Sequence, residues 1–242
     1  MIARVLVFTV VSFSLGAACI RFVNRRSVAE RRRERWIKLG GYFAVVHAVL
    51  ACAWLGRNAL GTLLLMVTVA GGRELVRAEQ GSGNLASFPS LATLGSYTLV
   101  AAALVAFAFS SAPSFTVYVY LIVASFDGFS QVVGETAGRH RLVPRVSPNK
   151  TVEGALGGFL AAMATGFALR PLTQLDWRNA LTTSALIGAA ALAGDLSASW
   201  VKRRSRIKDF GTLLPAQGGV LDRFDSFLFA GAATQLFVRI WR

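Results

Sequence analysis

The chain has 242 residues, of which 54% are hydrophobic and 16% are charged, and its mean hydropathy is +0.53. Soluble domains carry about 25% charged residues, so this composition excludes an ordinary soluble domain and indicates a membrane protein. The 26 Lys and Arg residues outnumber the 12 Asp and Glu residues, for a formal charge of +14. In a soluble protein this excess would suggest nucleic acid binding. In a membrane protein it is typical of cytoplasmic loops, so we expect no nucleic acid partner.

Apolar segments long enough to cross a bilayer recur along the whole chain. A transmembrane helix needs about 20 mostly apolar residues, and eight such segments are evident. They cover approximately residues 2–20, 39–56, 58–76, 91–111, 114–134, 154–170, 180–200 and 225–240. We therefore expect an all-α fold, a polytopic transmembrane bundle of about eight spans, within limits of seven and nine.

Basic residues divide unequally between the two ends of such a bundle. The segments 21–38, 77–90, 135–153 and 201–224 fall on one side and, with Arg73 at a span end, hold 20 of the 26 Lys and Arg residues. The positive-inside rule makes this side cytoplasmic and places both termini outside the cytoplasm. Tryptophan favours membrane interfaces, and all five lie near predicted span ends: Trp36, Trp54, Trp177, Trp200 and Trp241.

No segment between the spans is long enough to bury a core of its own. We expect an N-terminal transmembrane region over residues 1–112, with spans one to four and a basic cytoplasmic loop at 21–38. Residues 113–242 form a second transmembrane region with spans five to eight. Its cytoplasmic loops, 135–153 and 201–224, hold most of the residues that could carry chemistry, so we expect the function there.

Polar residues gather at the cytoplasmic end of the seventh span and in the loop after it. A carboxylate at a helix centre costs on the order of 3 kcal/mol to insert, so Asp195 is a functional candidate. The alternative is an interfacial ion pair with Lys202 or Arg203. The dense cations of this loop suit phosphate oxygens, and Gly218 and Gly219 would let backbone amides approach an anion.

Carboxylates are mixed with these cations. Asp222 and Asp225 are three residues apart and would share one helical face if the last helix begins before them. With Asp195 they indicate Mg²⁺, which takes one or two protein oxygens and completes its shell with water and substrate phosphate.

The loop at 135–153 is a second candidate. Lys150 and Thr151 precede a span, and together they offer a cation, a hydroxyl and a helix N-terminus to a phosphate group. Ser147 and Pro148 equally suit ordinary turn and capping chemistry, so this loop alone indicates little.

A family resemblance joins the two loops. From Ser199 to Asp225 the chain reads S-W-V-K-R-R-S-R-I-K-D-F-G-T-L-L-P-A-Q-G-G-V-L-D-R-F-D. This resembles the signature of the CDP-diacylglycerol synthases, also called phosphatidate cytidylyltransferases, at twelve of its thirteen specified positions. Residues 147–154 and the Gly-Asp pair at 194–195 resemble two further motifs of that family. The likeness is dense over 127–225 and vague over the first hundred residues.

The resemblance implies a metal-dependent nucleotidyltransferase of phospholipid biosynthesis. The phosphate of phosphatidate attacks the α-phosphorus of CTP, which gives CDP-diacylglycerol and pyrophosphate. It implies these catalytic residues: Asp195, Lys202, Arg203, Asp222 and Arg223. It implies these substrate-binding residues: Ser147, Lys150, Thr151, Ser199, Lys208, Gln217, Gly218 and Gly219. The implied Mg²⁺ ligands are Asp195, Asp222 and Asp225.

The same resemblance implies CTP, a lipid phosphate and the lipid bilayer as partners, and it leaves room for a second, monovalent cation such as K⁺ and for a homodimer. The implied location is a bacterial inner membrane, with the active site facing the cytoplasm.

Two departures from the family pattern keep other functions open. Gln217 replaces the signature histidine and cannot titrate near neutral pH. Residues 128–131, Gly-Phe-Ser-Gln, also differ from the usual pattern near Asp127. The alternatives are a paralogue that acts on another lipid phosphate, a non-catalytic membrane protein that binds lipid phosphate or nucleotide, and, ranked last, a transporter.

Other isolated polar residues have simpler interpretations. His47 fits a packed or interhelical hydrogen-bonding group. Glu74 and Arg77 fit an interfacial pair at i, i+3 spacing.

Overall fold

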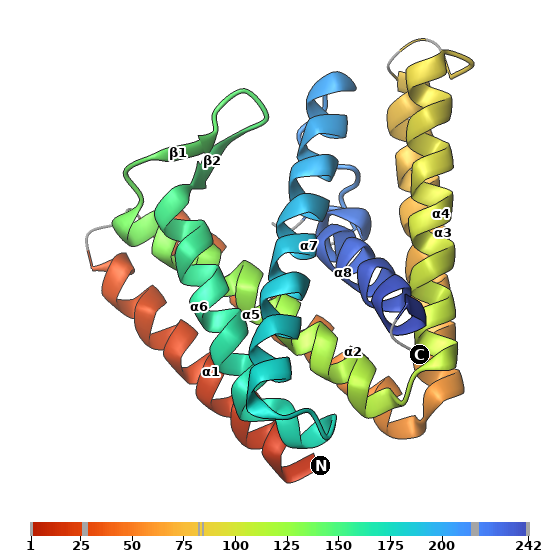
Figure 1. The fold of residues 1–242 in the computed structure, drawn as a ribbon. Helices are drawn as coiled ribbons and strands as arrows, with labels where there is room; N and C mark the ends of the chain where they lie inside the picture. The colour runs from red at the N-terminus through yellow and green to blue at the C-terminus, as the bar shows by residue number, and fades with distance from the viewer. Residues whose placement is uncertain (1, 26–28, 82, 84, 214–217, 241–242) are drawn as a thin grey trace.

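Helices make up most of the chain. A computed structural model describes residues 2–25, 29–81, 83, 85–213 and 218–240. Their order is α1 (Ile2–Asn24), α2 (Ala29–Leu55), α3 (Arg57–Gly81), α4 (Phe88–Ser110), α5 (Pro113–Ala137), β1 (Arg141–Val143), β2 (Ser147–Thr151), α6 (Val152–Leu169), the 3₁₀ helix η1 (Arg170–Leu172), α7 (Trp177–Arg204) and α8 (Leu221–Ile240) (Figure 1). The predicted all-α transmembrane bundle is confirmed.

Seven of these helices, α1 to α7, are long and apolar enough to cross a membrane, so the chain is an integral membrane protein. The eighth predicted segment, 225–240, also forms a helix, α8. This helix is not among the seven, and its first five residues include the charged residues Asp222, Arg223 and Asp225. Each of the eight apolar segments in the sequence therefore corresponds to one helix.

Helix ends follow from local capping chemistry. The side chain of Asp176 accepts a hydrogen bond from the amide of Asn179 at 2.8 Å at the start of α7, and Thr151 does the same for Gly154 at 3.1 Å at the start of α6. Such caps satisfy amides that the first helical turn leaves without partners. Between α2 and α3 the chain turns at Gly56, whose φ of +113° favours glycine.

The prediction of a basic loop over residues 21–38 is wrong, because most of that segment is helical. Helix α1 continues to Asn24 and α2 begins at Ala29, so the run Arg31–Arg33 lies on a helix. Arginine and glutamate are good helix formers, so a charged run can end the apolar part of a span without ending its helix.

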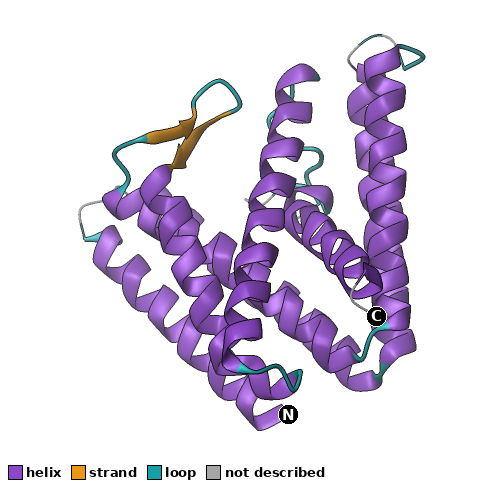
Figure 2. Ribbon diagram, viewed as in Figure 1, coloured by secondary structure: helices purple, strands orange, loops and turns teal. Residues whose placement is uncertain are grey.

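The loop at 135–153 is also more ordered than expected. Helix α5 continues to Ala137, and the antiparallel strands β1 and β2 form a hairpin, in which Val143 pairs with Ser147 and Arg141 with Thr151. The hairpin, drawn as the orange strands in Figure 2, extends past the ends of the two helices that it joins, α5 and α6, at one end of the bundle. It carries Lys150 and ends at the first turn of α6.

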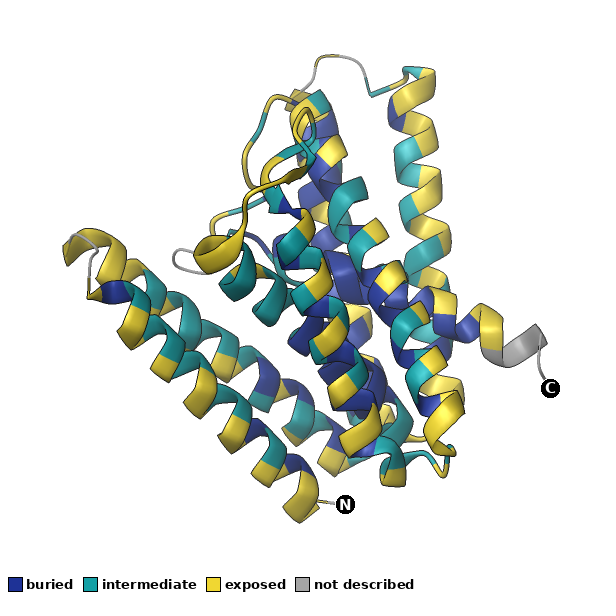
Figure 3. Cartoon of the chain, turned by 60° about the vertical axis from the view of Figure 1, so that its left-hand side comes forward, coloured by how far each residue is buried: buried dark blue, intermediate teal, exposed yellow. Residues whose placement is uncertain are grey.

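Helices α5 and α8 form the buried part of the bundle. Helix α5 packs most extensively against α6, and α8 lies obliquely between α7 and the pair formed by α3 and α4 (Figure 1). Tyr118 and Phe126 of α5 and Phe227 of α8 are almost completely buried. The outer helices keep exposed positions along their length (Figure 3), for example Val7 and Val10 of α1. Those apolar faces suit contact with acyl chains.

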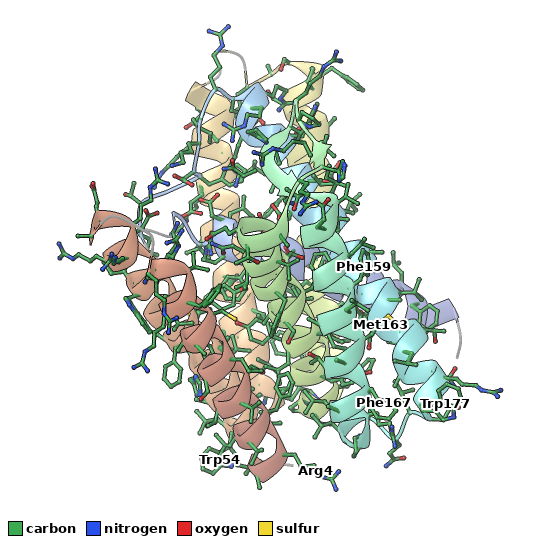
Figure 4. All side chains as sticks on the ribbon, turned by 90° about the vertical axis from the view of Figure 1, so that its left-hand side faces the viewer. Arg4, Trp54, Phe159, Met163, Phe167 and Trp177 are labelled. Carbon is green, nitrogen blue, oxygen red and sulfur yellow. The ribbon has the colours of Figure 1, made fainter. Side chains whose placement is uncertain are left out.

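The two ends of the bundle differ in character. Arg4, Trp54 and Trp177 lie at the end opposite the hairpin, whereas many nitrogen-bearing side chains gather at the hairpin end (Figure 4). The last turns of α1, α3 and α7 and the first turns of α2, α4 and α8 also lie toward the hairpin end (Figure 1). The four segments with most of the basic residues therefore share one end.

Candidate active site

A cavity of about 860 Å³ is lined by both halves of the chain. Its apolar wall includes Phe8, Phe13 and Ile20 of α1. The charged wall comes from α2, α5, the hairpin, α7 and α8. Charged residues along this wall include Arg35, Lys38, Asp127, Lys150, Asp195, Lys202, Asp222, Arg223 and Asp225.

Three carboxylates from three different helices face this cavity. Asp127 belongs to α5, Asp195 to α7 and Asp225 to α8, and their charges act on one another. Ser226 donates a hydrogen bond to Asp127 Oδ1 at 3.1 Å. Like charges held together in a partly buried site favour a cation beside them.

The hairpin supplies one such cation. Lys150, at the end of β2, forms an ion pair with Asp195, and Ser199 Oγ lies 3.5 Å from Asp195 Oδ1 as a hydrogen-bond donor. The structure thus pairs Asp195 with a residue 45 positions earlier, and not with Lys202 or Arg203 of its own helix. The antiparallel pairing of β1 and β2 brings Lys150 to this position.

Asp222 accepts three hydrogen bonds from within the protein. Lys202 Nζ donates to its Oδ1 at 2.8 Å, and the amides of Phe210 and Gly219 donate to its Oδ2 at 2.7 and 2.9 Å. Its side chain is only 2% exposed. Gly218 has a φ of +85°, and a Cβ there would lie 2.6 Å from Asp222 Oδ2. The anion that the Gly219 amide binds in this structure is therefore the carboxylate of Asp222.

Arg223 offers a different kind of group. It lines the cavity, and its Nε is buried without a hydrogen-bond partner among the described residues. A buried donor without a partner costs about 1–3 kcal/mol. A phosphate oxygen would satisfy it.

Several predicted site residues lie beside the cavity instead of on its wall. Arg203 is exposed, and its Nε donates to the carbonyl of Val146 at 3.3 Å, which supports the hairpin. Thr151 lines the cavity, but its hydroxyl oxygen caps α6. Among the described residues, five other predicted ones are absent from the cavity wall: Ser147, Ser199, Lys208, Gly218 and Gly219. Gln217 lies outside the residues that the structure describes.

The cavity is also lined by residues that were assigned no role from the sequence. Arg35 and Lys38 reach it from α2, where Arg35 donates to Glu135 Oε2 at 3.3 Å and to Asn24 Oδ1 at 3.0 Å. Residues at i and i+3 share one face of a helix, so the spacing of Arg35 and Lys38 could have indicated a shared cationic surface. The assignment of 21–38 to a loop hid this pattern. Asp127 could have been found by the criterion applied to Asp195, because it is also a carboxylate inside a span.

Comparisons with known proteins show which proteins this chain is similar to. A family model described as "Cytidylyltransferase family" matches residues 1–241. Over 114 residues the chain is 40% identical to the phosphatidate cytidylyltransferase of Bacillus subtilis (strain 168), a match that covers 46% of this chain and 42% of that one.

Two further relatives match similar lengths. The phosphatidate cytidylyltransferase of Brucella abortus biovar 1 (strain 9-941) is 40% identical over 126 residues, which cover 52% of this chain and 47% of the relative. The protein of Escherichia coli (strain K12) named "Uncharacterized protein YnbB" is 38% identical over 123 residues, which cover 50% and 41%. Each match spans less than half of the relative's own length.

Proposed function

The chain belongs to the cytidylyltransferase family, and on that premise we propose that it is a phosphatidate cytidylyltransferase. It would convert CTP and phosphatidate to CDP-diacylglycerol and pyrophosphate in phospholipid biosynthesis. The observation that carries this proposal is the cavity itself, because the residues that α1 contributes to its lining carry no charge, whereas the other elements contribute carboxylates and cations. Such a cavity suits a substrate that is half lipid and half phosphate.

The two substrates would use different parts of the cavity. The acyl chains of phosphatidate would lie against the apolar wall of α1, near Phe8 and Phe13, and remain continuous with the bilayer. CTP would enter at the hairpin end, where the basic segments gather. The positive-inside rule supports a cytoplasmic position for that end, and the bacterial relatives support an inner membrane.

The side chains of the cavity suit phosphoryl transfer without a covalent enzyme intermediate. That chemistry depends mostly on positioning and charge neutralisation. Arg223 and Lys202 would hold phosphate oxygens, Arg223 through a buried nitrogen that has no partner in the described part of the chain and Lys202 from its position beside Asp222. Arg35 and Lys38 would extend this cationic surface toward α2.

The donor set also fits a magnesium ion. Within the described residues, no group of three or more His, Cys, Asp and Glu side chains is arranged to hold a metal. Mg²⁺, however, commonly takes one or two carboxylates and keeps several waters. Asp195 and Asp225 would hold it, with Asp127 close by, and the bound ion would neutralise phosphate charge. Asp222 also lines the cavity, and Lys202 and two backbone amides already donate hydrogen bonds to its carboxylate. A second, monovalent cation such as K⁺ and a homodimer stay predictions.

A substrate screen tests the proposal. Purified protein in lipid nanodiscs is incubated with each of the four ribonucleoside triphosphates and with several lipid phosphates, and liponucleotides are separated by thin-layer chromatography. We expect product from CTP with phosphatidate and little from any other pair. Product with a different lipid phosphate would identify a paralogue with another acceptor. No product with any pair would contradict an enzymatic function.

A substitution at Gln217 tests the non-catalytic alternative. If Gln217→His creates activity in a protein that is otherwise inactive, the chain is a decayed relative of the enzymes. An active wild-type protein excludes that alternative directly.

A further inference from the structure

A buried carboxylate outside the cavity holds the start of α8. Glu74 belongs to α3, is 8% exposed and does not line the cavity. Its Oε1 accepts a hydrogen bond from the amide of Val220 at 3.0 Å, and its Oε2 accepts one from the amide of Leu221 at 2.8 Å. The sequence suggested that Glu74 pairs with Arg77 at i, i+3 spacing. That interpretation is wrong for the main contacts of Glu74, which are with these two amides, and Arg77 is exposed.

This contact is a helix cap supplied from a distant part of the chain. The first amides of a helix lack partners within the helix, and a negative charge at that end also interacts favourably with the helix dipole. Caps usually come from the residue just before the helix. Here the cap comes from a residue 147 positions before Leu221.

The loop before α8 is shaped around the same carboxylate. A Cβ on Gly211 would lie 2.6 Å from Glu74 Oε1, and a Cβ on Gly219 would lie 2.6 Å from Glu74 Cδ. Both distances are shorter than real Cβ contacts. Glycine is thus needed at two points, eight residues apart, for the Glu74 carboxylate to fit between them.

The first five residues of α8 include three charged residues of the proposed site. Asp222, Arg223 and Asp225 all lie within four residues of Leu221, whose amide Glu74 holds. Any change in the direction in which α8 begins would move these three residues relative to Asp195 on α7.

We propose that Glu74 is a positioning residue for the transfer reaction. It fixes the start of α8 from α3, and through α8 it sets the places of Asp222, Arg223 and Asp225. This inference rests on the proposed function for its effect on turnover. Its effect on the α8 amides can be measured without turnover.

Two substitutions at Glu74 distinguish the effect of the carboxylate charge from the effect of side-chain length. In Glu74→Gln, one oxygen still accepts an amide, but the side-chain NH₂ replaces the second acceptor and faces another donor. In Glu74→Asp, both oxygens remain, but the side chain is one methylene shorter. We expect Glu74→Gln to lower kcat by about 10- to 100-fold, because small displacements of reacting groups have effects of that size. We expect Glu74→Asp to fall between that variant and wild type.

Glu79→Gln is the matched control. Glu79 also lies on α3, is completely buried, and accepts hydrogen bonds from Arg204 and from Ser90 Oγ, the latter at 2.6 Å. We expect Glu79→Gln to lower the melting temperature but to keep kcat of the folded fraction within about threefold, because it leaves the contacts at Val220 and Leu221 in place. Equal loss of kcat in the two glutamine variants would overturn the inference, as would full kcat in Glu74→Gln.

Hydrogen exchange separates a failure of this inference from a failure of the proposed function. In nanodiscs, Glu74→Gln should speed exchange in a peptide covering 218–225 by about tenfold, because the cap of its first amides is weakened, whereas Glu79→Gln should not. Unchanged exchange in Glu74→Gln would overturn the positioning role, whatever the activity. A wild-type protein that makes no liponucleotide would overturn the proposed function, while the exchange result would still decide the role of Glu74 at α8.

Discussion

Asp222→Asn is the substitution whose effect the structure defines most fully. The change removes the negative charge that faces Lys202 at 2.8 Å, and the two side chains are 2% and 12% exposed. Both carboxylate oxygens of Asp222 accept hydrogen bonds in the wild-type protein. In asparagine, one of these oxygens is replaced by an NH₂ group, which donates and does not accept. Lys202 or a backbone amide then loses its acceptor in a buried place.

The size of this effect follows from burial. Removing one partner of a buried ion pair costs about 3–5 kcal/mol. For a chain of this length, each kcal/mol shifts the melting temperature by about 2–4 °C, so the lower figure corresponds to a fall of about 6–12 °C. Because Asp222, Arg223 and Asp225 all lie within the first five residues of α8, we also expect pyrophosphate release to be abolished.

Thermal unfolding in detergent and pyrophosphate release in nanodiscs measure the two effects. The double variant Lys202→Met with Asp222→Leu is the control, because replacing both charges with apolar groups can be nearly neutral for stability. It should recover much of the melting temperature without recovering activity. A single variant with the wild-type melting temperature and full pyrophosphate release would refute the role given to Asp222.

Four further outcomes are expected. Lys150→Met should lower kcat by about 100-fold or more, because it removes the cation paired with Asp195 and misplaces that carboxylate; wild-type kcat would exclude Lys150 from the site. Gly219→Ala should give little folded protein in a detergent gel-filtration assay, because its Cβ would overlap the carboxyl group of Glu74, and normal yield and activity would contradict that packing. Chelation by EDTA should stop pyrophosphate release and added Mg²⁺ should restore it, whereas activity that persists in EDTA would remove the metal from the site. Asp176→Ala should lower stability by about 1 kcal/mol through loss of the α7 cap and leave kcat unchanged, because the cap lies at the end of α7 away from Asp195.

The sequence was sufficient to locate the eight α-helices that the structure describes, because each one contains an apolar run of nearly spanning length. Their ends were harder to place. The charged residues of 29–38 leave the apolar pattern but continue α2, since charged residues are good helix formers. The β-hairpin was missed because its strands have three and five residues, too short for a periodic pattern to stand out.

The sequence was sufficient to identify site residues that belong to one motif. It was not sufficient to identify contacts between helices that are distant in the sequence. Asp195, Lys202, Asp222 and Arg223 were found because they combine charge with an apolar setting or a family motif. Glu74 was assigned to a local pair because i, i+3 partners are visible in a sequence, whereas a cap on a helix 147 residues later is not. The engagement of Asp222 by the amides of the preceding loop depends in the same way on how that loop folds back.

The fate of each phosphorus atom of CTP tests the proposed reaction most directly. Wild-type protein in nanodiscs with phosphatidate receives CTP labelled with radioactive phosphorus at the α position in one sample and at the γ position in another. Attack on the α-phosphorus predicts that the α label appears in the lipid fraction as CDP-diacylglycerol and that the γ label appears in pyrophosphate. A γ label in the lipid, or no label in the lipid from either sample, would contradict cytidylyl transfer.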